Sequence, residues 1–519
     1  MANARLLWVG YSYKEDSVHV EVLKVLRQRE LIEFCVATGG KPEPIGSSIL
    51  DEPVISHKDA QFANYEEINP FFNQKIDRLA YSIFSSFEGE TLRMMDRLYK
   101  RREKYWINDD SFDFRRKKFL RHCSFWLDYI QSKRITNVLF NGVPHEIYTF
   151  VISKIAEHLN IPTLILHHEK IGTPRKIDGI LYGKHYQRTV HREVFHVSEN
   201  LADIGNWSMS QKINETAKFL GAQLIHGDPL GPLLEVDESN LNNSAVVLRH
   251  SSTIRFFKEV IKVFRRPPPA VVPYLSPARS NSILGSFGGR FREIKIFIRR
   301  ANKSRIQRRE HLRIACTADE NKNTVIYFLS CQPEESSSPR GDIFCDQYYA
   351  IEGIARSLPE GWALRVREHP DQYGKRIPRS DNYLRNLTKL PQVSIVPLGE
   401  TVAQSFSNVK AAAGIAGTSC VESWVRKVPL LLFGDMILKK APGVFFIETL
   451  PAIVSALERV RGGFSPSESE IDAFKEWSSN HSYTGSLGRI YGDPTFRGVT
   501  INNFEAIISS WFYLTYTNL

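Results

Sequence analysis

The chain has 519 residues, of which 42% are hydrophobic and 11% aromatic, and its formal net charge is +11. This length exceeds a single hydrophobic core, so two large domains are expected, and the composition excludes a disordered chain. The six cysteines show neither a Cys-x-x-Cys motif nor zinc spacing, which predicts free thiols in a reducing compartment. No apolar run approaches the ~20 residues of a membrane-spanning helix, and the first is too short for a signal peptide. A cytoplasmic protein is therefore predicted.

The first half of the chain alternates strand-like and helix-like runs. Strands are predicted at 4–9, 31–37, 135–140 and 161–166, and helices at 17–29 and 146–159. The intervening region, 40–130, is irregular and aromatic-rich, with helical stretches at 72–85 and 90–105. The last strand, helix and strand form one βαβ unit, which predicts parallel pairing through a right-handed crossover.

The middle of the chain breaks this alternation. Residues 236–315 contain a proline cluster and a Ser/Gly stretch, which are typical of linker sequence, and then a basic run at 290–313. Phe and Ile side chains are interleaved with the Arg and Lys side chains of this run. It therefore predicts either an amphipathic helix on an anionic membrane surface or a solvated helix face beside the linker. No nucleic-acid-binding module accompanies it, so no nucleic acid is expected as a partner.

Strands and helices alternate more regularly in the second half, and terminal helices follow. Strands are predicted at 324–329, 362–366, 393–396, 409–415 and 429–433, and helices at 344–358, 401–407, 420–426, 470–478 and 504–516. This alternation is typical of a doubly wound parallel sheet.

Two polar loops follow predicted strands of the second half. The first is Arg365-Val366-Arg367-Glu368-His369-Pro370, and the second, Gly417-Thr418-Ser419-Cys420-Val421-Glu422, also opens a helix. Parallel sheets bind ligands at such loops, and helix amides there favour an anion. We therefore predict a site for a phosphorylated, ribose-containing ligand, formed by Arg367, His369, Gly417, Thr418, Ser419 and Glu422. Arg365 and Arg367 are expected on one face of their strand. The alternatives are helix capping by Thr418 or Ser419 and a structural histidine.

Carboxylates and histidines after other strands are candidates for the chemical step. Glu334 and Asp342 lie in a long polar loop after the strand at 324–329, where either carboxylate can assist at a sugar, Glu334 by preference. His145-Glu146 and His168-Glu169 follow the two strands of the βαβ unit, so we expect them at one sheet edge as sources of a general base. A surface cluster is the alternative for these pairs, and helix capping is the alternative for Asp342. None of these pairs forms a His-Glu-x-x-His site, so no metal is expected.

Several motifs occur in an order that is similar to a known family. They are Gln332-Pro333-Glu334, Gly341 with Asp346-Gln347, Leu358-Pro359-Glu360-Gly361-Trp362, Arg367-Glu368-His369-Pro370, Gly417-Thr418-Ser419-x-x-Glu422 and Pro429-Leu430-Leu431-Leu432-Phe433-Gly434. In this order they resemble bacterial capsular polysaccharide biosynthesis glycosyltransferases, a group similar to the Kdo transferases of capsule and lipopolysaccharide assembly. The chain has Arg367 where many relatives have Lys, and Cys420 and Ser423-Trp424 where relatives have smaller residues.

The resemblance implies a fold and a division of the chain. The fold is GT-B, an α/β architecture of two Rossmann-like doubly wound domains facing across a cleft, with the donor nucleotide mostly on the C-terminal domain. The expected parts are an acceptor-side domain (1–235), a basic linker or helical insertion (236–315), a nucleotide-sugar-binding domain (316–480) and terminal helices packing back on the body (481–519). In related enzymes, residues matching His369, Thr418 and Ser419 hold the phosphate of a CMP-sugar.

The predicted function is a metal-independent glycosyltransferase that needs no cofactor and builds a bacterial surface polysaccharide. The favoured donor is CMP-Kdo, the acceptor is a glycan or lipid-linked glycan, and Glu334, His145, Glu146 and His168 are the candidate catalytic residues. The alternatives are a UDP- or GDP-sugar donor, a CDP-polyol donor, a sugar-nucleotide epimerase, and a non-enzymatic glycan- or nucleic-acid-binding protein. The expected location is the cytoplasm, with a peripheral position at the inner membrane through 290–313.

Overall fold

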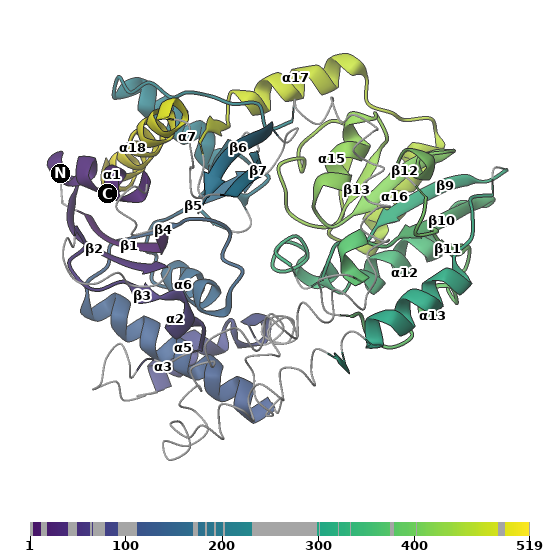
Figure 1. The fold of residues 1–519 in the computed structure, drawn as a ribbon, viewed down its shortest axis with the longest axis horizontal. Helices are drawn as coiled ribbons and strands as arrows, with labels where there is room; N and C mark the ends of the chain where they lie inside the picture. The colour runs from purple at the N-terminus through teal and green to yellow at the C-terminus, as the bar shows by residue number, and fades with distance from the viewer. Residues whose placement is uncertain are drawn as a thin grey trace.

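The computed structural model contains two α/β domains, which Figure 1 shows as two lobes. It describes residues 4–11, 18–39, 49–62, 65, 78–91, 112–169, 175–181, 184–190, 194–200, 203–230, 298–299, 302–319, 321–332, 334–373, 378–400, 402–485 and 494–517. Most of the predicted linker, and the stretch at 92–105, lie outside these residues.

The N-terminal domain is built on a seven-stranded sheet with the order β15-β8-β5-β4-β1-β2-β3. Its strands are β1 (Ala4–Tyr11), β2 (Ile32–Gly39), β3 (Ile55–Ser56), β4 (Asn137–Phe140), β5 (Thr163–Glu169), β8 (Val194–Ser198) and β15 (Tyr483–Thr484). The first five strands pair in parallel, β8 runs antiparallel to β5, and β15 runs antiparallel to β8. After β3 the chain returns to the other side of β1, so the strand order changes direction between β1 and β4.

Helices cover both faces of this sheet. They are α1 (Val18–Gln28), α2 (His57–Phe62), α3 (Arg78–Ser85), α5 (Phe112–Ser132), α6 (Ile147–His158) and α7 (Ser208–Phe219), and a separate ribbon is formed by β6 (Arg175–Leu181) and β7 (Lys184–Val190). Successive side chains of β1 point to opposite faces, so Leu7 packs with Trp126 of α5 while Leu6 and Trp8 belong to the core on the other face. Burial on both faces explains why this strand is a continuous apolar run.

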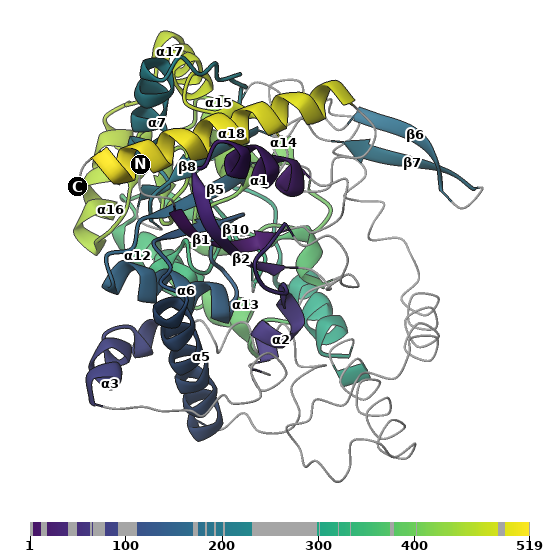
Figure 2. The ribbon, with the colours of Figure 1, turned by 90° about the vertical axis from the view of Figure 1, so that its left-hand side faces the viewer.

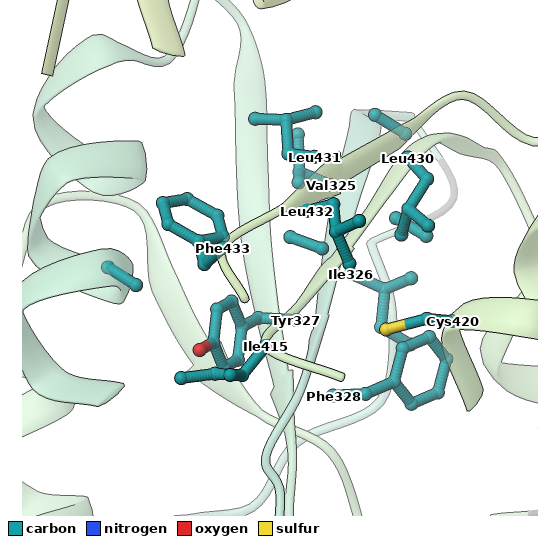
Figure 3. Packing of buried hydrophobic residues seen from close by; sticks show 14 of the residues in the cluster. Val325, Ile326, Tyr327, Phe328, Ile415, Cys420, Leu430, Leu431, Leu432 and Phe433 are labelled. Atoms are coloured by element: carbon teal, nitrogen blue, oxygen red, sulfur yellow. The ribbon is translucent and has the colours of Figure 1, made fainter. Parts of the chain in front are cut away.

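The C-terminal domain has a six-stranded parallel sheet with the order β11-β10-β9-β12-β13-β14. The strands are β9 (Asn323–Phe328), β10 (Trp362–Arg367), β11 (Val393–Ile395), β12 (Val409–Gly414), β13 (Leu430–Leu432) and β14 (Val444–Phe446). Numbered within the domain, this is the order 3-2-1-4-5-6 of a dinucleotide-binding fold. Figure 3 shows core side chains from β9 and β13, from the residues directly after β12 and β13, and from the helix at Thr418–Val425 that packs against them.

Most helices of this domain connect successive strands, as parallel pairing requires, and the last two follow the final strand of the sheet. They are α12 (Gln347–Ser357), α13 (Tyr383–Leu387), α14 (Val402–Ser405), α15 (Thr418–Val425), α16 (Leu450–Arg461) and α17 (Glu468–Ser479), with short 3₁₀ helices η5 (Asp342–Cys345) and η6 (Pro370–Tyr373). An unlabelled helix over 302–314 also contacts this domain.

The end of the chain returns to the N-terminal domain. After α17, strand β15 joins the edge of the first sheet, and α18 (Pro494–Thr517) packs against α1 and α7 (Figures 1 and 2). Phe504 and Trp511 of α18 enter the same core as Trp8 of β1. Two Rossmann-like domains joined in this way form the GT-B architecture, and the predicted fold class is confirmed.

The two domains also contact each other directly. Trp207, just before α7, donates its indole N–H to the carbonyl of Ile437 at 3.1 Å, and the Gly205 amide donates to Asp435 at 2.8 Å. A Cβ at Gly205 would lie 2.4 Å from the carbonyl oxygen of Met436, so only glycine permits this close approach. Contacts of the backbone as well as of side chains therefore join the two domains.

Most predicted strands match the observed ones within two residues, and two local predictions are wrong. Strand β5 runs to Glu169, so His168 and Glu169 lie inside it rather than after it, because β5 continues to pair with β8. Asp342 does not cap the helix after its loop. Asp346 does so, since its side chain accepts the Tyr348 amide, while Asp342 lies in η5.

Candidate nucleotide site

The carboxyl ends of β9, β10 and β12 bring the predicted phosphate-binding loops together. Strand β9 lies between the other two, and Phe328 at its end is in register with Arg367 on one side and Gly414 on the other. The change in strand order falls between β9 and β12, which is where doubly wound sheets bind their ligands. The loops that begin at Arg367 and Gly414 therefore flank the same edge of the sheet.

Arg365 and Arg367 point to the same side of β10, as predicted, but they have different environments. Arg365 is buried and makes two hydrogen bonds to Glu400, of 3.1 and 2.7 Å. Arg367 donates to the Ser405 hydroxyl at 2.5 Å and to the Glu400 carbonyl at 3.0 Å, and Ser405 in turn donates to the Glu400 carboxylate. Glu400 thus neutralises Arg365, and Ser405 with the Glu400 backbone fixes the direction of Arg367.

A buried ion pair supports the backbone of His369. Glu368 accepts the His369 amide at 2.7 Å and binds the Arg379 guanidinium through both oxygens, at 2.6 and 2.7 Å. Arg379 also donates to the carbonyl of Ser330 and to the side chain of Gln332, which follow β9. One guanidinium therefore joins the loop after β9 to the loop after β10, so the two loops are held in a fixed relation.

The second motif places the amino end of α15 in open space. Gly417 precedes the helix with φ of 139°, a conformation suited to glycine, and no atom lies within 4 Å of where its Cβ would be. Thr418 is exposed and Ser419 half-buried, and neither caps the helix, so the predicted capping alternative is wrong. Among the described residues we find no acceptor for the Thr418 and Ser419 amides. These amides and the helix dipole favour an anion.

Glu422 lies one turn into α15 and is coupled to Arg367. Burial raises the pKa of Glu422 above its usual value, while the positive charges of Arg426 and Arg367 oppose that rise. Burial likewise lowers the pKa of Arg367, and the negative charges of Glu400 and Glu422 oppose that change. A half-buried carboxylate beside a partly desolvated guanidinium can accept hydroxyl hydrogen bonds while the guanidinium binds phosphate.

The larger residues of this motif point away from the amino end of α15. Cys420 packs against Gly414, and Figure 3 shows its sulfur beside the ring of Phe328. The Ser423 hydroxyl donates to the Ser419 carbonyl, and the Trp424 indole donates to the Pro442 carbonyl. These substitutions relative to the resembled family therefore fill the domain core.

The three predicted catalytic residues whose side chains are described fall in three environments. His145 is half-exposed in the loop after β4, with Nδ1 2.7 Å from the Val143 carbonyl oxygen. Glu146 is buried and forms a capping box with Thr149 at the start of α6, a structural role. Glu334 lies in the loop after β9, where its carbonyl accepts hydrogen bonds from the Ser337 and Ser338 amides. The side chain of His168 lies outside the described part of the chain.

Sequence reasoning missed the partners that orient these groups. Glu400 and Ser405 stand in a loop and a short helix whose sequence shows no motif, and Arg340 lies near the end of the polar loop after β9. Arg340 pairs with Glu335 at 2.7 Å, and its charge also acts on two buried, stacked histidines, His167 and His196. These orienting residues can be identified only once the folded structure shows which side chains lie together.

Among the described residues, no group of three or more His, Cys, Asp or Glu side chains is placed to hold a metal ion. None of their helices is both long enough and apolar enough to cross a membrane.

Comparisons with known proteins give only distant similarities. No protein-family model and no curated protein sequence match the chain. A UDP-GlcNAc 2-epimerase structure from Methanocaldococcus jannaschii is 10% identical with a TM-score of 0.23, over 92% of this chain and 99% of that one. The wall teichoic acid polymerase TagF is 10% identical with a TM-score of 0.22, over 98% of this chain and 89% of that one. A UGT transferase from Siraitia grosvenorii is 11% identical with a TM-score of 0.23, over 98% and 100%. Similarities of this size define no activity, and the fold assignment rests on the topology of the chain itself.

Proposed function

We propose that the protein is a GT-B glycosyltransferase that binds the nucleotide of its donor at the carboxyl edge of the second sheet. The observation that carries this proposal is the placement of Arg367 and the amino end of α15. They follow the strands on either side of β9, beside the change in strand order; that end of α15 has no side-chain cap, and the charge of Arg367 acts on Glu422. A guanidinium and two helix amides suit a phosphate, and Glu422 suits the hydroxyls of a ribose.

Catalysis in this proposal depends on positioning and on stabilisation of the leaving phosphate. Arg367, His369 and the amides of Thr418 and Ser419 would stabilise the negative charge that develops as the bond from sugar to phosphate breaks. The ion pair of Glu368 and Arg379 would keep the loops in register before substrate arrives. Glu334 would assist at the sugar.

The favoured donor is CMP-Kdo and the favoured product a bacterial surface polysaccharide, because of the motif resemblance to capsule and lipopolysaccharide transferases. No metal or cofactor is part of this proposal. The acceptor would be a glycan or a lipid-linked glycan reached from the cytoplasm.

A thermal-shift screen with CMP, CDP, UDP and GDP tests the nucleotide. CMP at about 100 times its dissociation constant should add about 2.7 kcal/mol of stability, and Arg367→Gln should reduce that gain. Glu352→Gln, in an exposed ion pair on α12, is the matched control that should leave it unchanged. If UDP or GDP gives the larger shift, the CMP assignment is wrong; if no nucleotide stabilises the protein, the site assignment is wrong.

The reaction class needs a second assay. Release of nucleotide that depends on an acceptor supports a transferase, with a CDP-polyol included among the donors. Conversion of a sugar nucleotide without an acceptor would instead support an epimerase, the activity named for one of the similar structures.

A peripheral position at an anionic membrane also belongs to this proposal, and the helix over 302–314 supports it. Polar side chains fix its inner face: Gln307 donates to the Arg379 carbonyl at 2.7 Å, and a His311 ring nitrogen donates to the Val396 carbonyl at 2.8 Å. Ile314 also packs against the domain core, whereas Ile306 and Leu312 are exposed.

The outer face of this helix combines apolar and cationic side chains. Ile306 is 64% exposed and Leu312 is 60% exposed, and Arg309 and Arg313 are exposed on the same face. Each cation near an anionic leaflet is worth about 1 kcal/mol, and inserted apolar side chains add to this. The remaining basic residues from 290 to 297, and Arg300, lie outside the described part of the chain.

Vesicle sedimentation tests the membrane position. The protein should bind vesicles containing phosphatidylserine, and binding should fall as salt rises because screening weakens the attraction. Arg309→Gln with Arg313→Gln should weaken binding, whereas Arg461→Gln, on the remote helix α16, should not. An absence of binding at low salt would show that the helix is only a solvated face.

A further inference from the structure

We propose that Glu335 of the C-terminal domain orients His145 of the N-terminal domain as the general base of transfer, and that Arg340 holds Glu335 in place. This inference rests on the proposed function and adds a positioning residue to it. It follows from four contacts, two of which join loops that are far apart in the sequence.

The first contact fixes the tautomer of His145. Its Nδ1 lies 2.7 Å from the Val143 carbonyl oxygen. A carbonyl oxygen carries no hydrogen, so Nδ1 must be the donor, and in the neutral ring the lone pair then resides on Nε2. Among the described residues we find no hydrogen-bond partner for Nε2. The side chain is 33% exposed, so this nitrogen can reach a hydroxyl from solvent or substrate.

The second and third contacts place a carboxylate beside the ring. Glu335 Oε2 lies 3.8 Å from His145 Nδ1, while Oε1 accepts a hydrogen bond from Arg340 at 2.7 Å. Each carboxylate oxygen thus has its own partner. A negative charge beside Nδ1 stabilises the imidazolium that forms when Nε2 takes a proton, which is the function of the orienting group in a catalytic triad.

The fourth contact fixes Arg340 itself. Its carbonyl accepts the Asp435 amide at 3.0 Å, and Asp435 accepts the Gly205 amide of the N-terminal domain. The Arg340 side chain is only 9% exposed. The residue that holds Glu335 is therefore part of the contact between domains, so movement of the domains would move Glu335 relative to His145.

The position of this group matches the chemistry. The loop with His145 follows β4, next to the change in strand order of the first sheet, and the loop with Glu335 follows β9, next to that of the second. In the transfer step, Nε2 takes the proton of the acceptor hydroxyl as its oxygen bonds to the anomeric carbon. The bond from that carbon to the phosphate oxygen breaks, and the nucleotide leaves with the electron pair. Because base and orienting carboxylate come from different domains, the pair is complete only in this domain arrangement.

A double-mutant cycle on the full-length protein tests the pairing through turnover. His145→Ala should lower kcat by about 10²- to 10⁴-fold, the usual contribution of a general base, with little change in the KM for the donor. Glu335→Ala should lower kcat at least tenfold in the wild type and cause no further loss when His145 is already Ala. Glu335→Gln, which can still accept the Arg340 hydrogen bond, should lie between. Glu352→Ala is the control for loss of an Arg–Glu pair elsewhere.

Losses that multiply in the double variant would overturn the pairing while leaving the proposed function intact. A second measurement does not need turnover. In NMR spectra of histidine-labelled protein, His145 should be the Nδ1–H tautomer, and Glu335→Ala should shift its ring resonances while Glu352→Ala does not. An Nε2–H tautomer, or no response to Glu335→Ala, would also overturn the pairing. If no donor is turned over at all, the proposed function and the general-base role both fail.

Discussion

Removal of Glu368 should destabilise the C-terminal domain strongly. The carboxylate and its partner Arg379 have side chains that are 1% and 4% exposed, and the two hydrogen bonds between them measure 2.6 and 2.7 Å. Glu368→Ala would leave the Arg379 guanidinium buried with only the neutral acceptors of Ser330 and Gln332. Breaking one side of such a pair costs about 3–5 kcal/mol, because an uncompensated charge remains in the interior.

This loss should be visible by calorimetry of the full-length protein. For a domain of about 150–250 residues, each kcal/mol lowers Tm by about 2–4 °C, so the transition of the C-terminal domain should fall by about 6–20 °C. Glu352→Ala, which breaks an exposed ion pair, should cost at most about 1 kcal/mol.

A double replacement separates charge burial from packing. Glu368→Leu with Arg379→Met removes both charges and keeps much of the volume, so most of the lost stability should return. The reasoning is refuted if Glu368→Ala costs less than about 1 kcal/mol, or if the double variant is no more stable than the single one.

Three further outcomes are expected. His369→Ala should slow transfer by roughly one to three orders of magnitude, because one hydrogen-bond donor to the phosphate is lost. The protein should stay folded, because the residue lies at a strand end, and wild-type turnover would contradict the assignment. Ser405→Ala should weaken CMP binding in the thermal-shift assay by loosening Arg367, with little loss of stability in the absence of nucleotide; unchanged CMP binding would show that Arg367 needs no such support. Burial lowers the pKa of His196 to about 3. As pH falls below about 6.5, this histidine therefore takes up a proton in the unfolded chain but not in the folded protein, which lowers the free energy of unfolding. Between pH 6.5 and 4, the free energy of unfolding in urea should fall with pH by about 1.4 kcal/mol per pH unit more in the wild type than in His196→Gln, and equal slopes would contradict a neutral buried histidine.

The sequence determined the local elements and their class. Apolar runs such as those of β1 and β9 are buried on both faces, and burial of that kind leaves a signal in the residues themselves. The end of each apolar run also locates the loop that follows it. Because the carboxyl ends of parallel strands lie at one edge of a sheet, the segments at Arg367 and Gly417 could be identified as neighbours.

Only the tertiary structure decided what each charged side chain contacts. Arg365 and Arg367 are equivalent by alternation along β10, yet the Glu400 carboxylate binds the first, whereas the Glu400 backbone carbonyl accepts a hydrogen bond from the second. Strand β5 extends through His168 because β8 offers it hydrogen bonds. Glu335, in the other domain, lies 3.8 Å from the Nδ1 of His145. The spacing of apolar residues in the sequence indicates which face of a helix or strand is buried. The partner of a polar side chain depends instead on which distant loops the folded chain brings close together, and the spacing carries no information about that.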